Sequence, residues 1–194
     1  MSSTFISNSK TEADDLKTRL SQLINASQEL KFLVGFFYFS GIQELYEPLK
    51  EKVKKDEEID IKILAGLNVD HLSSQIVEFG GDESNLDDKE RAEKFVNDLT
   101  EAISHKDFDR EEFYEQVNFF LSLIKEGKLK IRKTYNPNHA KLYIFKPEQG
   151  FEEFQSGKFI TGSSNLTKSG LSGQEELNIE IGDYGVEDAE EYFD

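Results

Sequence analysis

Two strand-like runs that carry polar, chemically reactive side chains lie within one stretch of the sequence, from His139 to Asn178. The first run, HAKLYIF, starts at His139 and alternates apolar residues with the others. Alternation with a period of two predicts a strand, in which His139 and Lys141 share one face about 7 Å apart. A nucleophile or base beside a fixed cation suits the binding and reaction of a phosphate ester.

The second run, KFIT at 158–161, leads directly into the sequence GSSN at 162–165. We expect a strand that ends in a tight polar turn. Such a turn can direct backbone N–H groups and short polar side chains at an anion. The stretch closes on QEELN, which contains Glu176. The two runs and Glu176 together make a candidate phosphate site.

These motifs, taken in order, resemble those of the phospholipase D superfamily. The resemblance rests on His-x-Lys at 139–141, Gly-Ser-x-Asn about twenty residues later and Glu176 about a dozen residues further. More narrowly, GSSNLT at 162–167, GL at 170–171 and ELN at 176–178 are similar to phospholipase D-like domains attached to bacterial helicases and restriction-type nucleases.

The family's full motif also carries an Asp after the Lys. This chain reads YIFKP at 143–147 and has no acid there before Glu148. The nuclease and helicase-associated branches often lack that Asp, so its absence is typical of a subfamily. The resemblance also implies the fold class, which is α/β: a mixed, mainly parallel sheet flanked by helices, with a helical insertion.

The resemblance assigns a role to each matched residue. His139 would attack phosphorus and form a phosphohistidine, which water resolves. Lys141, Ser163 and Asn165 would hold the non-bridging oxygens as charge builds up, and Glu176 would orient the imidazole. The residues alone leave open which serine of the GSSN turn faces the phosphate, and the family register favours the first.

A second histidine must protonate the leaving oxygen. Family members with two copies of the motif supply both histidines, whereas this chain has one copy. We therefore expect a two-fold homodimer in which His139 of each subunit enters one shared site. We expect no metal or other cofactor, because the sequence has no clustered set of Asp, Glu and His ligands.

The charge distribution bears on the partner. The net charge is −16, which is unusual for a protein that binds DNA. From Lys125 to Gly170, however, nine Lys and Arg residues stand against four Glu, a net charge of +5, so the remainder carries −21. Local field matters more than net charge for an anionic substrate. Two interpretations of Lys128, Lys130 and Arg132 stay open, a binding surface or the solvated face of an ordinary strand.

The absence of Cys excludes disulfides, thiolate metal sites and a Cys nucleophile, and it agrees with a cytoplasmic protein. The N-terminus has no basic region followed by an apolar run, so we expect no signal peptide. The longest apolar run, from Phe32 to Phe39, is too short to span a bilayer, and no membrane partner is expected.

Along the chain, helical and strand-like patterns alternate at first. Residues 9–27 predict a helix, 30–39 a strand buried on both faces, 42–55 a second helix and 59–65 another strand. Strand–helix–strand with this spacing predicts a right-handed parallel unit. Strands are also expected at 129–135 and 176–181, and a helix from 186 onward.

Residues 72–127 have a different pattern, with two amphipathic helices, and we interpret them as a helical insertion that ends at Gly127. His71 lies just before this segment and His105 within it, and both are expected to be surface or loop residues. We expect residues 1–194 to form a single domain. The ending at Asp194 suggests a fragment of a longer protein, and the resemblance implies a C-terminal helicase domain in that protein. No nucleotide-binding Gly-x-x-x-x-Gly-Lys motif is present, so we expect the helicase motor to be absent from this chain.

Two functions of different classes follow from the sequence. The first is a metal-independent phosphodiesterase, a nuclease acting on DNA or RNA. The second is a non-catalytic nucleic-acid-binding module of a helicase, since fold and motif do not fix activity. A lipid substrate is a distant third, because no basic amphipathic helix is present. Taken singly, His139 could be an ordinary strand histidine and Lys141 an ordinary exposed lysine.

Overall fold

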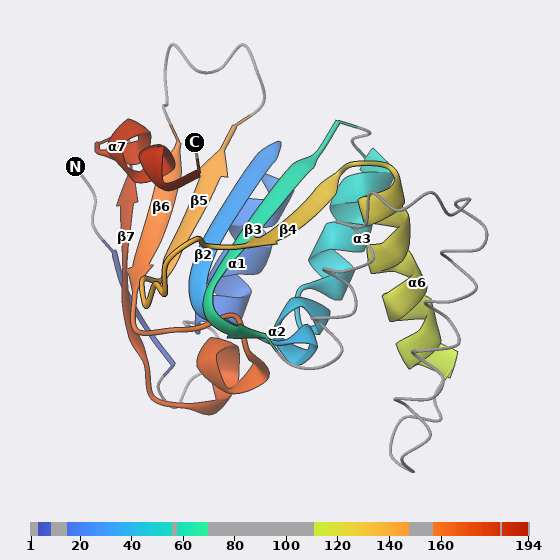
Figure 1. Ribbon diagram of the computed structural model, residues 1–194, viewed down its shortest axis with the longest axis horizontal. Coiled ribbons are helices and arrows are strands. Elements are labelled where there is room, and N and C mark those ends of the chain that lie inside the picture. The colour runs from blue at the N-terminus through green and yellow to red at the C-terminus, as the bar shows by residue number, and fades with distance from the viewer. Residues whose placement is uncertain are drawn as a thin grey trace.

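The computed structural model describes residues 4–8, 15–55, 58–69, 111–147, 157–182 and 184–193. Its centre is a seven-stranded sheet (Figure 1). In spatial order the strands are β1 (Thr4–Ser7), β7 (Leu177–Gly182), β6 (Lys158–Gly162), β5 (Leu142–Lys146), β2 (Glu29–Phe37), β3 (Asp60–Val69) and β4 (Leu129–Lys133).

The sheet is mixed and flanked by helices, which confirms the expected α/β class. The expectation that the sheet is mainly parallel is wrong, because most of its strand pairings are antiparallel. β2, β3 and β4 are parallel, as the strand–helix–strand pattern predicts, but the other four pairings are antiparallel. The physical reason is the connection between strands. β5, β6 and β7 are consecutive in the described sequence and adjacent in the sheet, and the chain reverses direction from each of them to the next.

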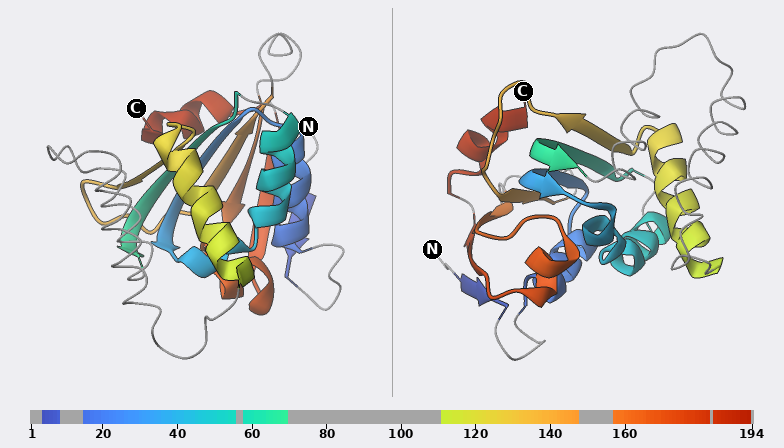
Figure 2. Two further views of the ribbon diagram at one scale, coloured as in Figure 1. Left: turned by 90° about the vertical axis from the view of Figure 1, so that its right-hand side faces the viewer. Right: turned by 60° about the horizontal axis from the view of Figure 1, so that its bottom comes forward.

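Helices cover both faces of the sheet (Figure 2). One face carries α1 (Leu16–Asn25), α2 (Phe39–Gln43), α3 (Tyr46–Lys55) and α6 (Glu111–Lys125). The other carries α7 (Val186–Glu190), which continues into the 3₁₀ turn η3 (Glu191–Phe193). A short π-helical turn, η2 (Ser169–Gly173), lies between β6 and β7.

The helix expected over 42–55 is divided into α2 and α3. Next to this break, α2 packs closely against the segment that follows β6. A Cβ at Gly41 would lie 2.2 Å from the backbone oxygen of Leu166, so only glycine fits there. The backbone N–H of Tyr38 also donates to that oxygen at 3.1 Å. This packing joins the end of β2 to the segment that follows the GSSN turn.

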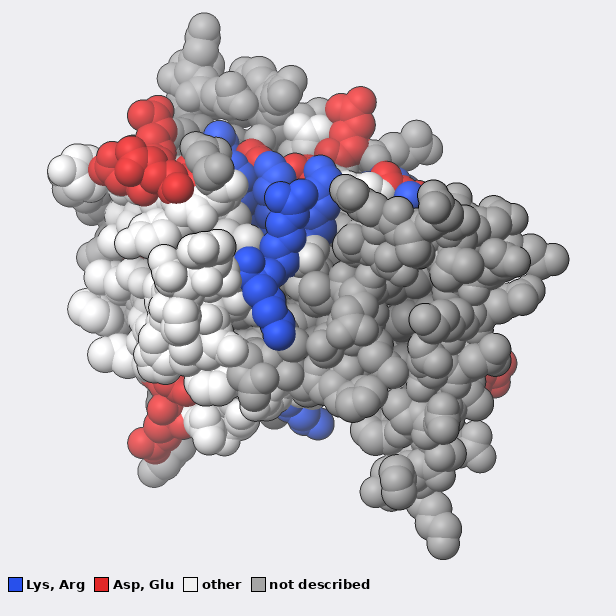
Figure 3. Space-filling model, viewed as in Figure 1, with Lys and Arg blue, Asp and Glu red and all other residues white. Residues whose placement is uncertain are grey.

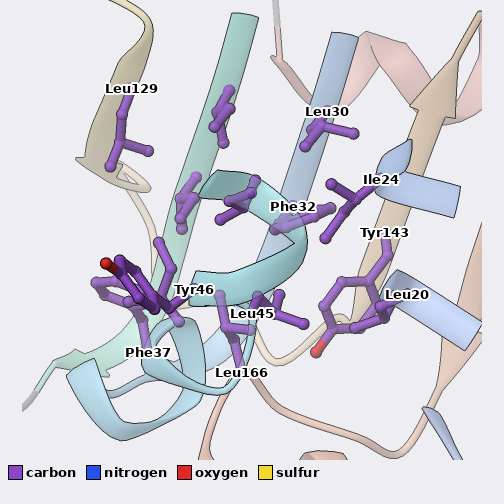
Figure 4. Packing of buried hydrophobic residues seen from close by; sticks show 14 of the residues in the cluster. Leu20, Ile24, Leu30, Phe32, Phe37, Leu45, Tyr46, Leu129, Tyr143 and Leu166 are labelled. Atoms are coloured by element: carbon purple, nitrogen blue, oxygen red, sulfur yellow. The ribbon is translucent and has the colours of Figure 1, made fainter. Parts of the chain in front are cut away.

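The larger core cluster lies between the sheet and α1, α2, α3 and α6 (Figure 4). The rings of Phe32 and Tyr143, from neighbouring strands, meet edge to face with centroids 5.3 Å apart. A smaller cluster on the other face joins Leu33 and Ile144 to Val186 of α7. β2 contributes to both clusters, which confirms that it is a central strand buried on two faces.

The end of α6 confirms the expected glycine cap. Gly127 has a φ of 72°, its N–H donates to the oxygen of Ile124 at 3.0 Å, and the N–H of Lys128 donates to that of Leu123 at 2.8 Å. α6 belongs to the expected helical insertion. The remainder of that segment through residue 110, with His71 and His105, lies outside the described residues.

Strand register brings the predicted motifs to one edge of the sheet. Leu142 at the start of β5 pairs with Leu33 of β2 and with Thr161 of β6, and Gly162 pairs with Asn178 of β7. The carboxyl ends of β2, β3, β4 and β6 therefore meet the amino ends of β5 and β7. In the part of the chain described, no helix has the length and apolar character needed to cross a membrane.

Candidate functional site

His139 and Lys141 lie just before β5, because that strand begins at Leu142 and not at His139 as the alternation predicts. A local turn replaces the strand: the side-chain oxygen of Asn138 accepts a hydrogen bond from the N–H of Ala140 at 2.8 Å. The N–H of Asn138 in turn donates to the oxygen of Gly66 at 2.9 Å. The turn is thereby fixed to the end of β3.

The turn brings the two side chains into direct contact. The Lys141 Nζ lies 3.1 Å from each ring nitrogen of His139 and donates to the His139 backbone oxygen at 2.7 Å. Lys141 is only 6% exposed, so it is not an ordinary surface lysine. Burial lowers the pKa of Lys141, and the nearby Glu176 carboxylate opposes that shift. His139 itself is exposed.

Asn165, at the end of the GSSN turn, lies beside the same residue of β2, Gly35, as His139 does. Its Oδ1 accepts a hydrogen bond from the backbone N–H of Phe36 at 2.9 Å. A Cβ on Gly35 would lie 3.2 Å from this oxygen and 3.3 Å from the His139 Cδ2. The small size of Gly35 therefore lets Asn165 and His139 approach β2 together.

β2 contributes to the site in a way that the sequence motifs do not predict. The register of β2 against β3 shifts between Val34 and Phe36, which re-aims this end of the strand. The Phe36 ring meets the His139 ring at a right angle, with centroids 6.3 Å apart. A glycine within the apolar run of β2 was the available signal, because a strand glycine often marks a bulge or a close approach.

The two serines of the turn have different environments. Ser164 is fully buried, its N–H donates to the Asn178 Oδ1 at 3.3 Å, and its Oγ accepts from the Asn178 Nδ2 at 2.9 Å. Ser163 is exposed, and its Oγ accepts from the N–H of Leu177 at 3.1 Å. Of the two serines, only Ser163 therefore presents its side chain at the surface. Asn178 stabilises the turn from its buried side, through the two hydrogen bonds to Ser164.

Glu176 lies directly before β7 and is partly buried. Burial lowers the pKa of Lys141, and the Glu176 carboxylate offsets part of that shift. Burial raises the pKa of Tyr143, and the same carboxylate adds to that shift. Among the described residues, no hydrogen bond joins this carboxylate to the His139 ring. The buried Tyr143 donates its hydroxyl to the Ser164 oxygen at 2.9 Å, so it supports the GSSN turn.

The acid of the full family motif would lie in β5. In this chain, the corresponding end of β5 has a structural role. Lys146, at the far end of this strand from the site, pairs with Glu190 of α7 at 3.2 Å and with Glu29 of β2 at 3.9 Å. This end of β5 is part of an ion-pair cluster that attaches α7. Within the described ranges, no group of three or more His, Cys, Asp or Glu side chains is arranged to hold a metal ion.

The comparisons with known proteins agree with these motifs. The family described as cardiolipin synthase, phospholipase D-like domain, matches residues 20–194. No curated protein matches the sequence. Among solved structures, Nuc from Salmonella typhimurium, a phospholipase D family member, has a TM-score of 0.51 and 13% identity over 99% of this chain and 89% of that chain.

NucT from Helicobacter pylori has a TM-score of 0.53 and 14% identity, over 99% of this chain and 92% of that chain. At these identities the two structures show a shared fold and no more. The family match, in contrast, spans most of the sequence and includes every motif described above. The chain therefore belongs to the phospholipase D-like domain family.

Proposed function

We propose that this domain is a metal-independent phosphodiesterase of the nuclease type, which cleaves through a phosphohistidine on His139. The direct contact of Lys141 with the exposed His139, together with the position of Asn165 beside the same glycine of β2, carries the proposal. Membership of the phospholipase D-like family and a fold shared with Nuc and NucT support it.

In the proposed reaction a ring nitrogen of His139 attacks phosphorus, and the bond from phosphorus to the leaving oxygen breaks. The leaving oxygen takes a proton from a second histidine. Water then attacks the phosphohistidine, releases the phosphate product and restores the free imidazole. Negative charge builds up on the non-bridging oxygens in both steps, so fixed donors beside His139 lower both barriers.

Lys141 and Asn165 are the donors best placed for this task. Lys141 holds its ammonium in a largely buried position, where an incoming phosphate would offset the cost of burial. The Asn165 Oδ1 is occupied by the Phe36 N–H, which leaves the amide Nδ2 as a donor. Ser163 adds an exposed hydroxyl, and Glu176 is proposed to orient the imidazole once substrate binds.

We further propose a homodimer in which His139 of a second subunit is the acid. Exposed apolar residues near the site support such an interface. Leu177, whose backbone binds the Ser163 hydroxyl, is 58% exposed, and Phe5 on the neighbouring β1 is 70% exposed. Phe5 pairs with Ile179, two residues after Leu177, so both project from one face of the sheet.

DNA is the proposed substrate, with RNA as an alternative, and a C-terminal helicase domain is the proposed partner in a longer protein. Residues 1–194 are proposed to be one domain with a helical insertion at 72–127. A non-catalytic nucleic-acid-binding module is the second candidate. The lack of a hydrogen bond between Glu176 and the imidazole in the described part of the chain favours it.

Hydrolysis of bis-p-nitrophenyl phosphate and of DNA in EDTA tests the proposal, with the native chain compared with His139→Ala. A nuclease gives EDTA-resistant turnover that this variant loses, while its melting temperature stays the same. An unchanged rate in the variant contradicts the proposal. Absence of turnover in both proteins, with DNA bound equally by both, selects the binding module.

A further inference from the structure

A row of cations lies across the parallel strands at one edge of the sheet. Lys62 of β3 pairs in register with Lys130 of β4, and Arg132 follows two residues later on the same face. Figure 3 shows Lys and Arg side chains gathered in a strip on this face, over the region of β3 and β4. Such a strip is notable in a chain of net charge −16.

The cations differ in how they are paired. Lys62 and Lys130 both contact Asp60, at 3.1 and 3.5 Å, at the end of the strands away from the site. Arg132 is exposed at the site end, and it pairs with no carboxylate among the residues that the structure describes. Lys133, the next residue of the strand, projects from the opposite face. As far as the described residues go, the charge of Arg132 is available to an external anion beside the candidate site.

Tyr135 follows these cations and is fully exposed, at 101%. The backbone around it is nevertheless fixed. The Thr134 N–H donates to the Ala65 oxygen at 3.1 Å, and the Thr134 hydroxyl donates to the Asn136 oxygen at 2.7 Å. Tyr135 is four residues before His139, so the two Cα atoms are at most about 14 Å apart.

Two further aromatic side chains lie near the histidine. Phe36 and Tyr38, both partly exposed, meet edge to face with centroids 6.4 Å apart, and Phe36 also contacts the His139 ring. Exposed aromatic faces combined with a cationic groove or strip are how proteins hold single-stranded nucleic acid, since unpaired bases stack on aromatic rings.

We propose that a single-stranded nucleic acid is the ligand of this surface, with a phosphate on Arg132 and a base stacked on Tyr135. Its backbone then continues from the end of β4 to His139. This inference rests on the proposed function and deepens it, because it names the strandedness of the substrate and a specificity-determining residue. A duplex keeps its bases stacked inside, so it cannot use the Tyr135 ring in this way.

Binding of a fluorescent single-stranded oligonucleotide and of the matching duplex tests the inference by anisotropy in EDTA. His139→Ala is the background in every protein, so that the ligand is not consumed. We expect tighter binding of the single strand. Tyr135→Ala should weaken it about 5- to 150-fold, and Tyr135→Phe should retain most of the affinity. The control is Tyr184→Ala, another exposed tyrosine, which follows the end of β7 away from the site.

Salt dependence tests the cations separately. Replacing Arg132 with Gln should reduce the slope of log affinity against log salt by about 0.7 for a single strand. Replacing Lys54 and Lys55, exposed at the end of α3, should leave the slope unchanged.

Unchanged binding in Tyr135→Ala, or equal weakening of single strand and duplex, would overturn the inference. Failure of the proposed function would appear in a different experiment, as the absence of EDTA-resistant hydrolysis of bis-p-nitrophenyl phosphate. Tyr135-dependent oligonucleotide binding without that hydrolysis would leave the surface assigned and remove the catalytic role. The two failures are therefore distinguishable.

Discussion

The side-chain oxygen of Asn165 accepts a 2.9 Å hydrogen bond from the backbone N–H of Phe36, across 129 residues of sequence. This bond fixes the GSSN turn to the end of β2 and orients the amide. Because the oxygen faces the protein, the Asn165 Nδ2 is the group that can donate to a substrate. The Asn165 Oδ1 thus has a structural role, whereas its Nδ2 has the proposed chemical role.

Asn165→Asp separates these two tasks. The carboxylate keeps an acceptor for the Phe36 N–H but has no donor and repels a phosphate. We expect kcat/KM to fall at least about 100-fold, the usual cost of one lost transition-state donor, with little change in melting temperature. Asn118→Asp, on the exposed face of α6, is the control for the added charge. Full activity in Asn165→Asp would exclude the proposed donor role.

Gly35→Ala tests the close approach of β2 to the site. The added methyl group would lie 3.2 Å from the Asn165 Oδ1 and 3.3 Å from the His139 Cδ2, so both side chains must shift by a few tenths of an ångström. We expect turnover to fall about tenfold or more, since small misplacements of catalytic groups are costly.

Gly173→Ala is the matched control for Gly35→Ala, because its nearest atom would be 3.7 Å away, an ordinary contact. Kinetics and thermal melting of both variants distinguish a local effect from a general loss of stability. If the two variants have the same turnover, the space at Gly35 is not important for the site.

Lys141 predicts a pH dependence of stability. Burial lowers its pKa from the ordinary value of 10.5, so between the lowered pKa and 10.5 the unfolded chain binds more protons than the folded one. The cost of holding this cation is therefore complete below the lowered pKa and is relieved as pH rises through it. Stability from this group increases with pH in that alkaline window.

Lys141→Met should remove this dependence. We expect the variant to be at least as stable as the native chain at neutral pH and to lose that advantage as the pH approaches 10.5, while its turnover falls at least about 100-fold. Urea unfolding at a series of pH values, with hydrolysis measured at neutral pH, checks both. A stability difference that grows with pH would contradict the account of a buried, charged lysine.

Asn178→Ala tests the support beneath the GSSN turn. Asn178 is 1% exposed and makes two hydrogen bonds with Ser164, so its removal leaves buried polar groups without a partner. We expect a loss of about 1–3 kcal/mol in the free energy of unfolding, together with lower turnover. Asn25→Ala, at the exposed end of α1, is the control. An equal effect of both variants would remove the special role of Asn178.

The family motifs and most strands can be recognised in the sequence, because both depend on local patterns. The alternation in β5 and the GSSN turn after β6 locate their elements directly. The wrong start of β5 has a local cause as well. The side chain of Asn138 binds the N–H of Ala140, and β5 therefore begins at Leu142 and not at His139.

The rest of the site depends on contacts between distant segments. The approach of Gly35 to Asn165 arises only when β2, β5 and β6 are assembled, and no local pattern encodes it. The burial of Lys141 is similar, since its alternation alone is compatible with an exposed strand residue. The antiparallel half of the sheet follows from how β5, β6 and β7 are connected, which hydrophobic periodicity does not reveal.

Trapping the covalent intermediate tests the central claim most directly. The native chain is mixed with an oligonucleotide in EDTA, quenched rapidly in alkali, which preserves phosphohistidine, and analysed by peptide mass spectrometry. We predict a phosphoryl-linked adduct on His139 that forms and decays during turnover and is absent from His139→Ala. Turnover that proceeds with no adduct on His139, or with an adduct on another residue, would contradict the account.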